Sequence, residues 1–216
     1  MNISRQHTIA ATKAANGNAK GPRARTQRLM LDTAIRMMQG GVTPSVSELS
    51  EEAGVSRATA YRYFPSQAAL VQAVINEGLG PILEWESPAE DTEARIVDLF
   101  DFSLPRIAEF EATFRAALKL SLEQWARRQA GTLGKEEEFR RGHRKELLEE
   151  AVQPLKDVLT ADQLKRLVAG LSVMFGIEAI LVLKDINGLD DDHVEKTIVW
   201  AARAMVRQAL AETGEG

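Results

Sequence analysis

The 216-residue sequence contains no cysteine. It therefore has no disulfide framework, no thiolate metal site and no cysteine nucleophile. Its three histidines are scattered, and none stands at metal-ligand spacing from another. A phosphate-binding glycine loop and a nucleophile elbow are also missing from the sequence. These absences lead us to expect a protein that is not an enzyme and that needs no metal or cofactor.

Long hydrophobic runs are missing as well. The most apolar stretch, Leu171 to Leu183, includes Ser172, Gly176 and Glu178. It is shorter than the roughly 20 residues that a membrane-spanning helix requires. The N-terminal residues lack the apolar run of a signal peptide. We therefore expect a cytoplasmic protein with no membrane partner.

The charge is unevenly distributed along the chain, although the net charge is only −4. Residues 1–65 contain nine basic and four acidic residues, whereas the remainder contains 18 basic and 27 acidic residues. A basic N-terminal part on an acidic body makes nucleic acid a candidate partner for that part alone. Charge by itself fits a basic tail without a partner equally well.

Strand-like alternation of polar and apolar residues does not occur, so we expect an all-α fold. Residues 1–22, rich in Ala, Asn, Gly and Lys, form an expected flexible arm. A helix-turn-helix domain is predicted over 23–80 and a larger helical domain over 81–216, with Pro81 and Pro88 at the joint. In that larger domain we expect helices at Asp91–Leu104 (ended by Pro105), Thr113–Ala130, Lys135–Val152, Ala161–Leu183 and Asp190–Ala211.

The segment from Ser45 to Phe64 is the most informative part of the sequence. Ser45 and Glu48 have the spacing of a capping box, Gly54 suits a turn, and Ser56 suits the cap of a second short helix. Together they predict a helix-turn-helix. The second helix would bury Val55, Ala60 and Phe64 and expose Arg57, Ala58, Thr59, Tyr61, Arg62 and Tyr63.

The exposed side chains are of the types that bind duplex DNA. Arginine donates two hydrogen bonds to guanine, the threonine methyl group contacts thymine, and tyrosine hydroxyls bind phosphate oxygens. A small residue such as Ala58 lets the helix approach the base edges. The alternative is an ordinary pair of helices whose polar residues form a solvated face.

Residues Arg28 to Ile75 resemble the tetracycline-repressor (TetR) family of bacterial transcription regulators. The resemblance includes Ala-Gly-Val-Ser at Ala53–Ser56, the Tyr-Arg-Tyr-Phe motif at Tyr61–Phe64, and Leu70. It implies a three-helix DNA-binding head on a larger helical body that binds a small effector and dimerises through its last two helices. It also implies a palindromic operator in double-stranded DNA.

Roles for single residues follow from the same resemblance. Ser45 and Ser56 are expected to be caps near phosphate, Arg57, Thr59 and Arg62 groove contacts, and Tyr61 and Tyr63 phosphate ligands. Two positions depart from the family pattern: Gln67 stands where a lysine is usual, and Ala60 where a larger aliphatic residue is usual. At Gln67 one charged phosphate contact is expected to become a neutral one, which would flatten the salt dependence of binding by about 0.9 in log–log slope.

Arg23, Arg25 and Arg28 lie just before or at the start of the first helix. A basic segment there reaches phosphates or the minor groove in homeodomain-type arms. The alternative, equally compatible with the sequence, is that these arginines only increase solubility.

The two C-terminal helices are predicted to be apolar on more than one side, so each must be covered on more than one side. We therefore expect a homodimer formed by these helices, with a central helix of a monomer as the alternative. An effector pocket is expected among the helices of residues 91–183. Its candidate residues are Phe100, Phe102, Phe114, Trp125, His143, Phe175 and Glu178.

The aromatic members of this set fit a packed core as well as a pocket. Glu178 stands among apolar residues, so its carboxylate needs a partner. We favour a basic residue on a neighbouring helix over a ligand.

The sequence therefore favours a ligand-responsive DNA-binding transcriptional regulator, released from its operator by a small-molecule effector and hence a repressor. Two alternatives stay open: an effector-independent architectural DNA-binding protein, and a helical enzyme or carrier whose head has lost its function.

Overall fold

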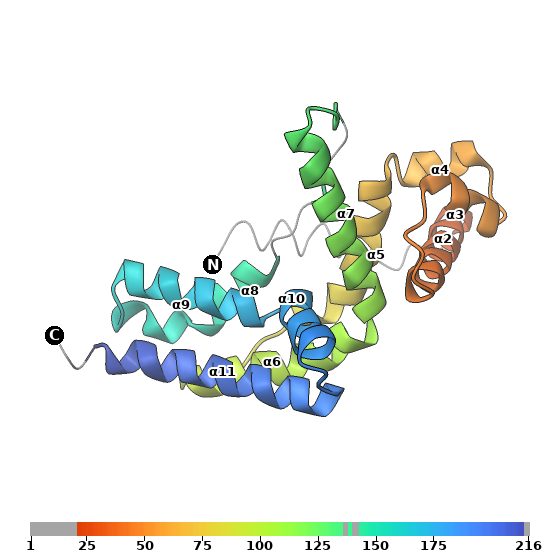
Figure 1. The fold of residues 1–216 in the computed structure, drawn as a ribbon. Coiled ribbons are helices and arrows are strands. Elements are labelled where there is room, and N and C mark those ends of the chain that lie inside the picture. The colour runs from red at the N-terminus through yellow and green to blue at the C-terminus, as the bar shows by residue number, and fades with distance from the viewer. Residues whose placement is uncertain (1–20, 136–137, 140–142, 214–216) are drawn as a thin grey trace. The chain divides into compact units, whose positions relative to one another are not determined.

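The structure is a computed structural model, and it describes residues 21–135, 138–139 and 143–213. All regular structure in these residues is helical, which confirms the all-α prediction (Figure 1). The chain divides into two compact units, Met1–Gly80 with Phe110–Arg141, and Pro81–Glu109 with Gly142–Gly216. Most of the expected arm, residues 1–20, lies outside the described residues.

The first unit contains α2 (Pro22–Gln39), α3 (Val46–Glu52), α4 (Arg57–Tyr63), most of α5 (Gln67–Leu83), and α7 (Glu111–Gln129). Its core joins the helix-turn-helix segment to a helix more than thirty residues further along the chain. The buried members of this core are Met30, Leu31, Ala34, Met38, Val46, Leu49, Ala60, Phe64, Ala68, Leu70, Val71, Val74, Ile75, Ala116, Ala117 and Leu120. The sequence did not predict that α7 packs with the N-terminal helices.

The second unit contains α6 (Thr92–Glu109), α8 (His143–Ala151), η1 (Gln153–Asp157), α9 (Ala161–Met174), α10 (Ile177–Leu181), η2 (Val182–Ile186) and α11 (Asp191–Ala211). Helix α11 packs against α6 and α9, and α9 packs against α8 (Figure 1). Arg95 of α6 connects this unit further, because its guanidinium donates to the backbone carbonyls of Ser87, Ala89, Glu150 and Ala151 at 3.0–3.2 Å.

Two prolines that we expected to delimit helices lie inside them. Helix α6 continues through Pro105 to Glu109, and α5 continues through Pro81 to Leu83. A proline removes one backbone hydrogen bond, and the loss is tolerated where the freed carbonyl reaches water. Both prolines are exposed and so meet this condition. Because α6 runs on to Glu109, the predicted end of the helix at Leu104 was wrong.

The helix predicted from Lys135 begins only at His143. Gly134 adopts a φ of +64°, which suits a turn, and the N–H of Phe139 donates to the side chain of Gln124 at 2.8 Å. That N–H is therefore bound to α7 rather than to a helical carbonyl four residues before it.

The long helix predicted over residues 161–183 is broken. Helix α9 ends at Met174, Gly176 has a φ of +151°, and α10 begins at Ile177. Backbone with such a φ is accessible almost only to glycine. The π-helical turn η2 follows α10. In the described part of the chain no single helix is long and apolar enough to cross a membrane; α9 together with Ile177–Ile186 has the length and composition but bends by 49°.

Candidate nucleic-acid interface

The two serine caps predicted for the helix-turn-helix are present. Ser45 Oγ accepts from the N–H of Glu48 at 3.2 Å, and the N–H of Ser45 donates to Glu48 Oε2 at 2.7 Å. The same hydrogen bond holds the pKa of Glu48 below its ordinary value. Ser56 Oγ accepts from the N–H of Thr59 at 3.2 Å. In each short helix one free N–H of the first turn is thus satisfied by the serine that precedes the helix.

Helix α4 has one buried and one exposed side, as predicted. Ala60 and Phe64 are almost fully buried in the core of the first unit, and Val55 is partly buried against it. Gly54 makes the turn with a φ of +65°. The exposed side carries Arg57, Ala58, Tyr61 and Arg62, whereas Thr59 and Tyr63 are half-buried.

The predicted basic residues fall into two groups. Within the described residues, Arg23, Arg25 and Arg62 are exposed and have no carboxylate within ion-pair distance, and Arg62 lies over the ring of Tyr63 at 5.4 Å. These three cations are available to phosphate.

The other two basic residues are engaged within the protein. Arg28 pairs with Glu77 at 2.6 Å and with Asp32 at 3.0 Å, and these carboxylates raise its pKa. Arg57 pairs with Glu51 of α3 at 2.6 Å.

Two of the expected phosphate ligands are hydrogen-bonded inside the first unit. The hydroxyl of Tyr63 donates to the carbonyl of Arg23 at 3.0 Å and so links the end of α4 to the start of α2. The amide of Gln67 donates to the carbonyls of Thr43 and Pro44, each at 3.2 Å, and holds the loop before α3.

Sequence reasoning missed the outer face of α3. Ser47 Oγ lies 3.3 Å from the hydroxyl of Tyr61, and Glu51 is the partner of Arg57. The spacing of four between Ser47 and Glu51, opposite the buried Val46 and Leu49, was the available signal.

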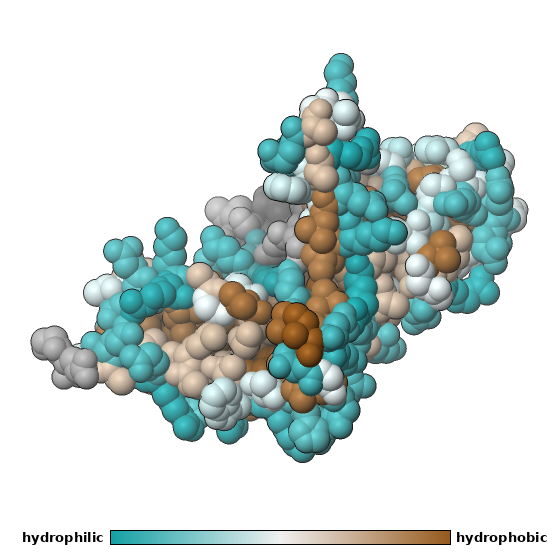
Figure 2. All heavy atoms as spheres, in the orientation of Figure 1, coloured by the Kyte–Doolittle hydropathy of each residue, from teal (hydrophilic) through white to brown (hydrophobic). Residues whose placement is uncertain are grey.

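The candidate effector residues are distributed over both units. Phe114 and Trp125 lie on α7 of the first unit; Phe114 packs against its core, and Trp125 is 57% exposed. Figure 2 shows a hydrophobic strip along α7. Leu122 and Trp125 of the same helix are exposed. Within the first unit these two residues therefore supply surface and core rather than an enclosed pocket.

The remaining candidates lie in the second unit. Phe100 and Phe175 are buried and pack edge to face with ring centroids 5.0 Å apart, whereas Phe102 is 49% exposed. Glu178 accepts from Arg144 of α8 at 2.9 and 3.1 Å, so the predicted basic partner on a neighbouring helix is confirmed. His143 is half-buried, and burial lowers its pKa.

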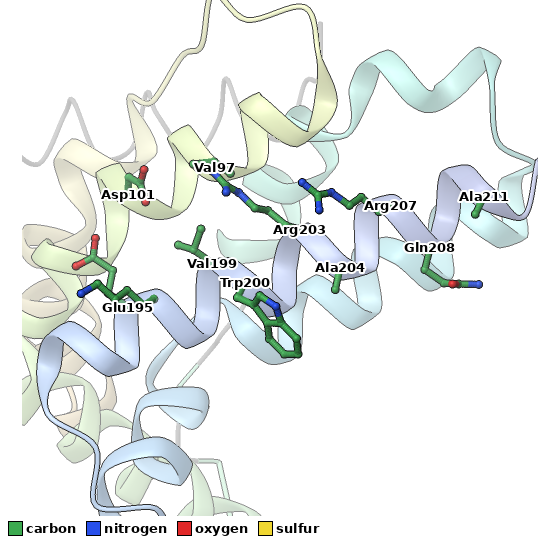
Figure 3. A pocket seen from close by; sticks show the side chains of 11 residues that line it. Val97, Asp101, Glu195, Val199, Trp200, Arg203, Ala204, Arg207, Gln208 and Ala211 are labelled. Atoms are coloured by element: carbon green, nitrogen blue, oxygen red, sulfur yellow. The ribbon is translucent and has the colours of Figure 1, made fainter.

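An open groove of about 690 Å³ runs between α6 and α11 (Figure 3). It contains none of the candidate effector residues. Arg207 on its edge pairs with Glu93 of α6, while Trp200 points away from α6. The lining consists of Val97, Asp101, Glu195, Lys196, Val199, Trp200, Arg203, Ala204, Arg207, Gln208 and Ala211. In the described residues no three His, Asp or Glu side chains gather as a metal site.

Comparisons with known proteins agree with the helix-turn-helix geometry of α3 and α4. Residues 30–74 match the family of bacterial regulatory proteins called the tetR family. The HTH-type transcriptional repressor LfrR of Mycolicibacterium smegmatis is 35% identical over 54 residues, which span 25% of this chain and 29% of that protein. The matched region of this relative is thus less than a third of its length.

A solved structure supports the fold over most of the chain. It is a TetR transcriptional regulator from Rhodococcus sp. RHA1, with a TM-score of 0.56, 19% identity, and coverage of 86% of this chain and 97% of that one. At this identity the likeness concerns the fold. Residues 30–74 thus match the tetR family of bacterial regulatory proteins, and the chain shares its overall fold with a solved TetR regulator.

Proposed function

We propose that this protein is a homodimeric transcriptional repressor that binds a palindromic operator and is released from it by a small-molecule effector. The observation that carries the proposal is the helix-turn-helix itself. Its second helix is capped by Ser56, seated on the core by Ala60 and Phe64, and exposes Arg57, Tyr61 and Arg62 on the opposite side. A short helix held in this way is what enters the major groove in helix-turn-helix proteins.

The basic residues without carboxylate partners support duplex binding. Arg23 and Arg25 at the start of α2 and Arg62 on α4 are linked through the hydrogen bond from Tyr63 to the Arg23 carbonyl. This bond keeps the start of α2 next to the end of the recognition helix. Arg23 and Arg25 at the start of α2 thereby lie near Arg62 on α4. Such a grouping suits contacts to phosphates that flank a groove.

Exposed apolar residues on the last helices support dimerisation. Trp200 on α11 is 71% exposed and Val173 on α9 is 61% exposed, although the opposite face of α11 is buried through Ile198, Ala202 and Val206. Tryptophan in particular is enriched in protein interfaces. Two-fold pairing of these helices would give two recognition helices for the two halves of a palindrome.

The ligand response rests on the family resemblance, since the polar pair of the second unit is satisfied within the protein. Arg144 and Glu178 stand beside the break between α9 and α10, with Phe175 at that break. An effector shifts a regulator from its operator only if it binds the non-binding conformation more tightly.

The test begins with the full-length protein and a library of random-sequence duplexes. We expect selection to recover a palindromic site that is bound in gel shifts at a salt concentration where unrelated duplex is not bound. Recovery of no preferred sequence would overturn the operator proposal. Binding with little sequence preference would favour the architectural alternative.

The effector is tested separately by a thermal-shift screen of metabolites. A compound that raises the melting temperature should also release the selected duplex. If none of the compounds that stabilise the protein alters its DNA affinity, the ligand-responsive part of the proposal fails while operator binding stands.

A further inference from the structure

The exposed side of the helix-turn-helix contains two polar contacts between α3 and α4. Ser47 Oγ faces the Tyr61 hydroxyl at 3.3 Å, and Glu51 Oε1 accepts from Arg57 Nη2 at 2.6 Å. Ser47 and Glu51 are four residues apart on α3, as Arg57 and Tyr61 are on α4. The contacts are therefore one helical turn apart on each helix and lie on the same side as the expected base contacts.

The Glu51–Arg57 pair is not explained by stability. Both side chains are about two-thirds exposed, at 66% and 67%, and exposed ion pairs contribute little to folding. Glu51 also stands in the last turn of α3, and Arg57 at the start of α4. Each charge has the sign that the dipole of its own helix disfavours at that end. A pair that neither helix favours suggests a functional role.

We infer that Glu51 is a specificity-determining residue of the DNA interface, acting by positioning Arg57. The inference rests on the proposed operator-binding function. Glu51 holds one terminal nitrogen of the guanidinium and so fixes the direction in which its remaining donors point. An arginine oriented in this way matches the two acceptors of guanine in the major groove.

The same pairing changes what Arg57 contributes to affinity. An unpaired arginine binds any phosphate and raises affinity for all sequences. With the Glu51 carboxylate beside it, the pair has no net charge and a phosphate is not attracted. Arg57 then discriminates between bases, whereas Arg23, Arg25 and Arg62 supply general attraction.

The experiment compares Glu51→Gln with Glu52→Gln in the full-length protein. Glu52 is exposed on the same helix and has no ion-pair partner in the described chain, so its substitution removes the same charge without touching Arg57. Dissociation constants are measured for the duplex recovered by selection, for each single-base variant of it, and for an unrelated duplex over a range of salt concentrations.

For Glu51→Gln we expect at least a tenfold loss of discrimination at one base pair in each half-site. Affinity for the unrelated duplex should rise severalfold, with a salt slope steeper by about 0.9 for the one phosphate gained. Glu52→Gln should leave base discrimination as in the wild type. In an Arg57→Ala background, Glu51→Gln should change discrimination no further, because its effect passes through Arg57.

Unchanged discrimination in Glu51→Gln, or an equal loss in Glu52→Gln, would overturn the inference while the wild-type site still supports operator binding. A wild-type protein without any preferred duplex would instead overturn the proposed function. Equal melting temperatures of the two variants exclude unfolding as the cause of a difference between them.

Discussion

Single arginines in the first unit differ in what they bind before DNA is present. Arg62 is exposed and lies over the ring of Tyr63, whereas Arg57 is held by one carboxylate and Arg28 by two. A guanidinium has five donors in a rigid fork, so one carboxylate leaves Arg57 able to bind a base edge. Arg28 has two carboxylate neighbours and is less suited to bind phosphate.

Replacement of Arg57 by alanine should weaken binding to the selected duplex by roughly 1–3 kcal/mol and relax the preference at one base pair. Affinity should fall because the variant loses two hydrogen bonds to guanine. Gel shifts with single-base operator variants measure both the affinity and the base preference. An unchanged base preference in this variant would remove Arg57 from direct readout.

His143, half-buried at the start of α8, makes stability depend on pH. Burial lowers its pKa, so the folded protein binds a proton less readily than the unfolded chain, whose histidine has a pKa of about 6.5. By linkage, stability is unaffected at higher pH and falls as pH decreases through about 6.5, until the folded-state pKa is passed.

We therefore expect His143→Gln to lose less stability than the wild type between pH 7 and pH 5. Urea denaturation of both proteins at a series of pH values tests this. Parallel pH profiles for the wild type and the His143 variant would contradict the assignment.

At the scale of helices, side-chain caps and one glycine decide where elements begin and end. Ser45, Ser56, Thr160 and Asp190 each accept a hydrogen bond from an N–H in the first turn of the helix that follows. The caps at Ser45 and Ser56 were predicted from the sequence, because donor and acceptor are three residues apart. The break at Gly176 was not predicted, because it is filled by a side chain from another helix. Arg144 donates to the carbonyl of Ser172 at 3.0 Å and to Glu178.

Replacing Gly176 with alanine should therefore destabilise the protein by about 1–3 kcal/mol. The backbone φ of +151° disfavours a side chain, and a Cβ there would lie 2.9 Å from Cζ of Arg144. Urea denaturation measures the loss. Adding Arg144→Ala should relieve only the steric part, and a fully stable Gly176→Ala variant would show that this break is not required.

On the scale of the whole molecule, the tertiary core distributes helices in a way that differs from their order in sequence. Helix α7 packs with the DNA-binding helices through Ala116, Ala117 and Leu120, whereas α6 before it belongs to the second unit. The predicted effector residues are consequently divided between the two units. The proposed dimer interface, by contrast, lies within the second unit, where α11 is buried on one face and exposes Trp200 on another.

Substitution of Trp200 by glutamate should shift the protein from dimer to monomer, with a dimer dissociation constant raised at least tenfold. A large aromatic side chain at an interface centre is a common hot spot, and a charge there would be buried without a partner. Sedimentation velocity measures the change. Operator affinity should fall with it, because two linked recognition helices bind far more tightly than one.

Leu122→Glu is the matched control for Trp200→Glu. Leu122 is 58% exposed on α7, outside the last two helices, so its replacement should leave the oligomeric state unchanged. A Trp200→Glu protein that remains a dimer would contradict the proposed interface.

Short-range patterns by themselves determined the helical class, the serine caps, the turn at Gly54 and the exposed side of α4. Each depends on residues within a few positions of one another, where periodicity and hydrogen-bond reach are set by helix geometry. The sequence also indicated that Glu178 needs a basic partner, since a carboxylate among apolar residues must be paired.

Only the tertiary structure decided which partner each group takes. Three features depend on packing between segments that are apart in the chain: Glu51 binds Arg57, Arg144 occupies the break at Gly176, and α7 joins the first unit. Such contacts are selected by the complementarity of whole surfaces and by the loop closures that bring them together. Local spacing, which sets only the face and register of each helix, does not contain this information.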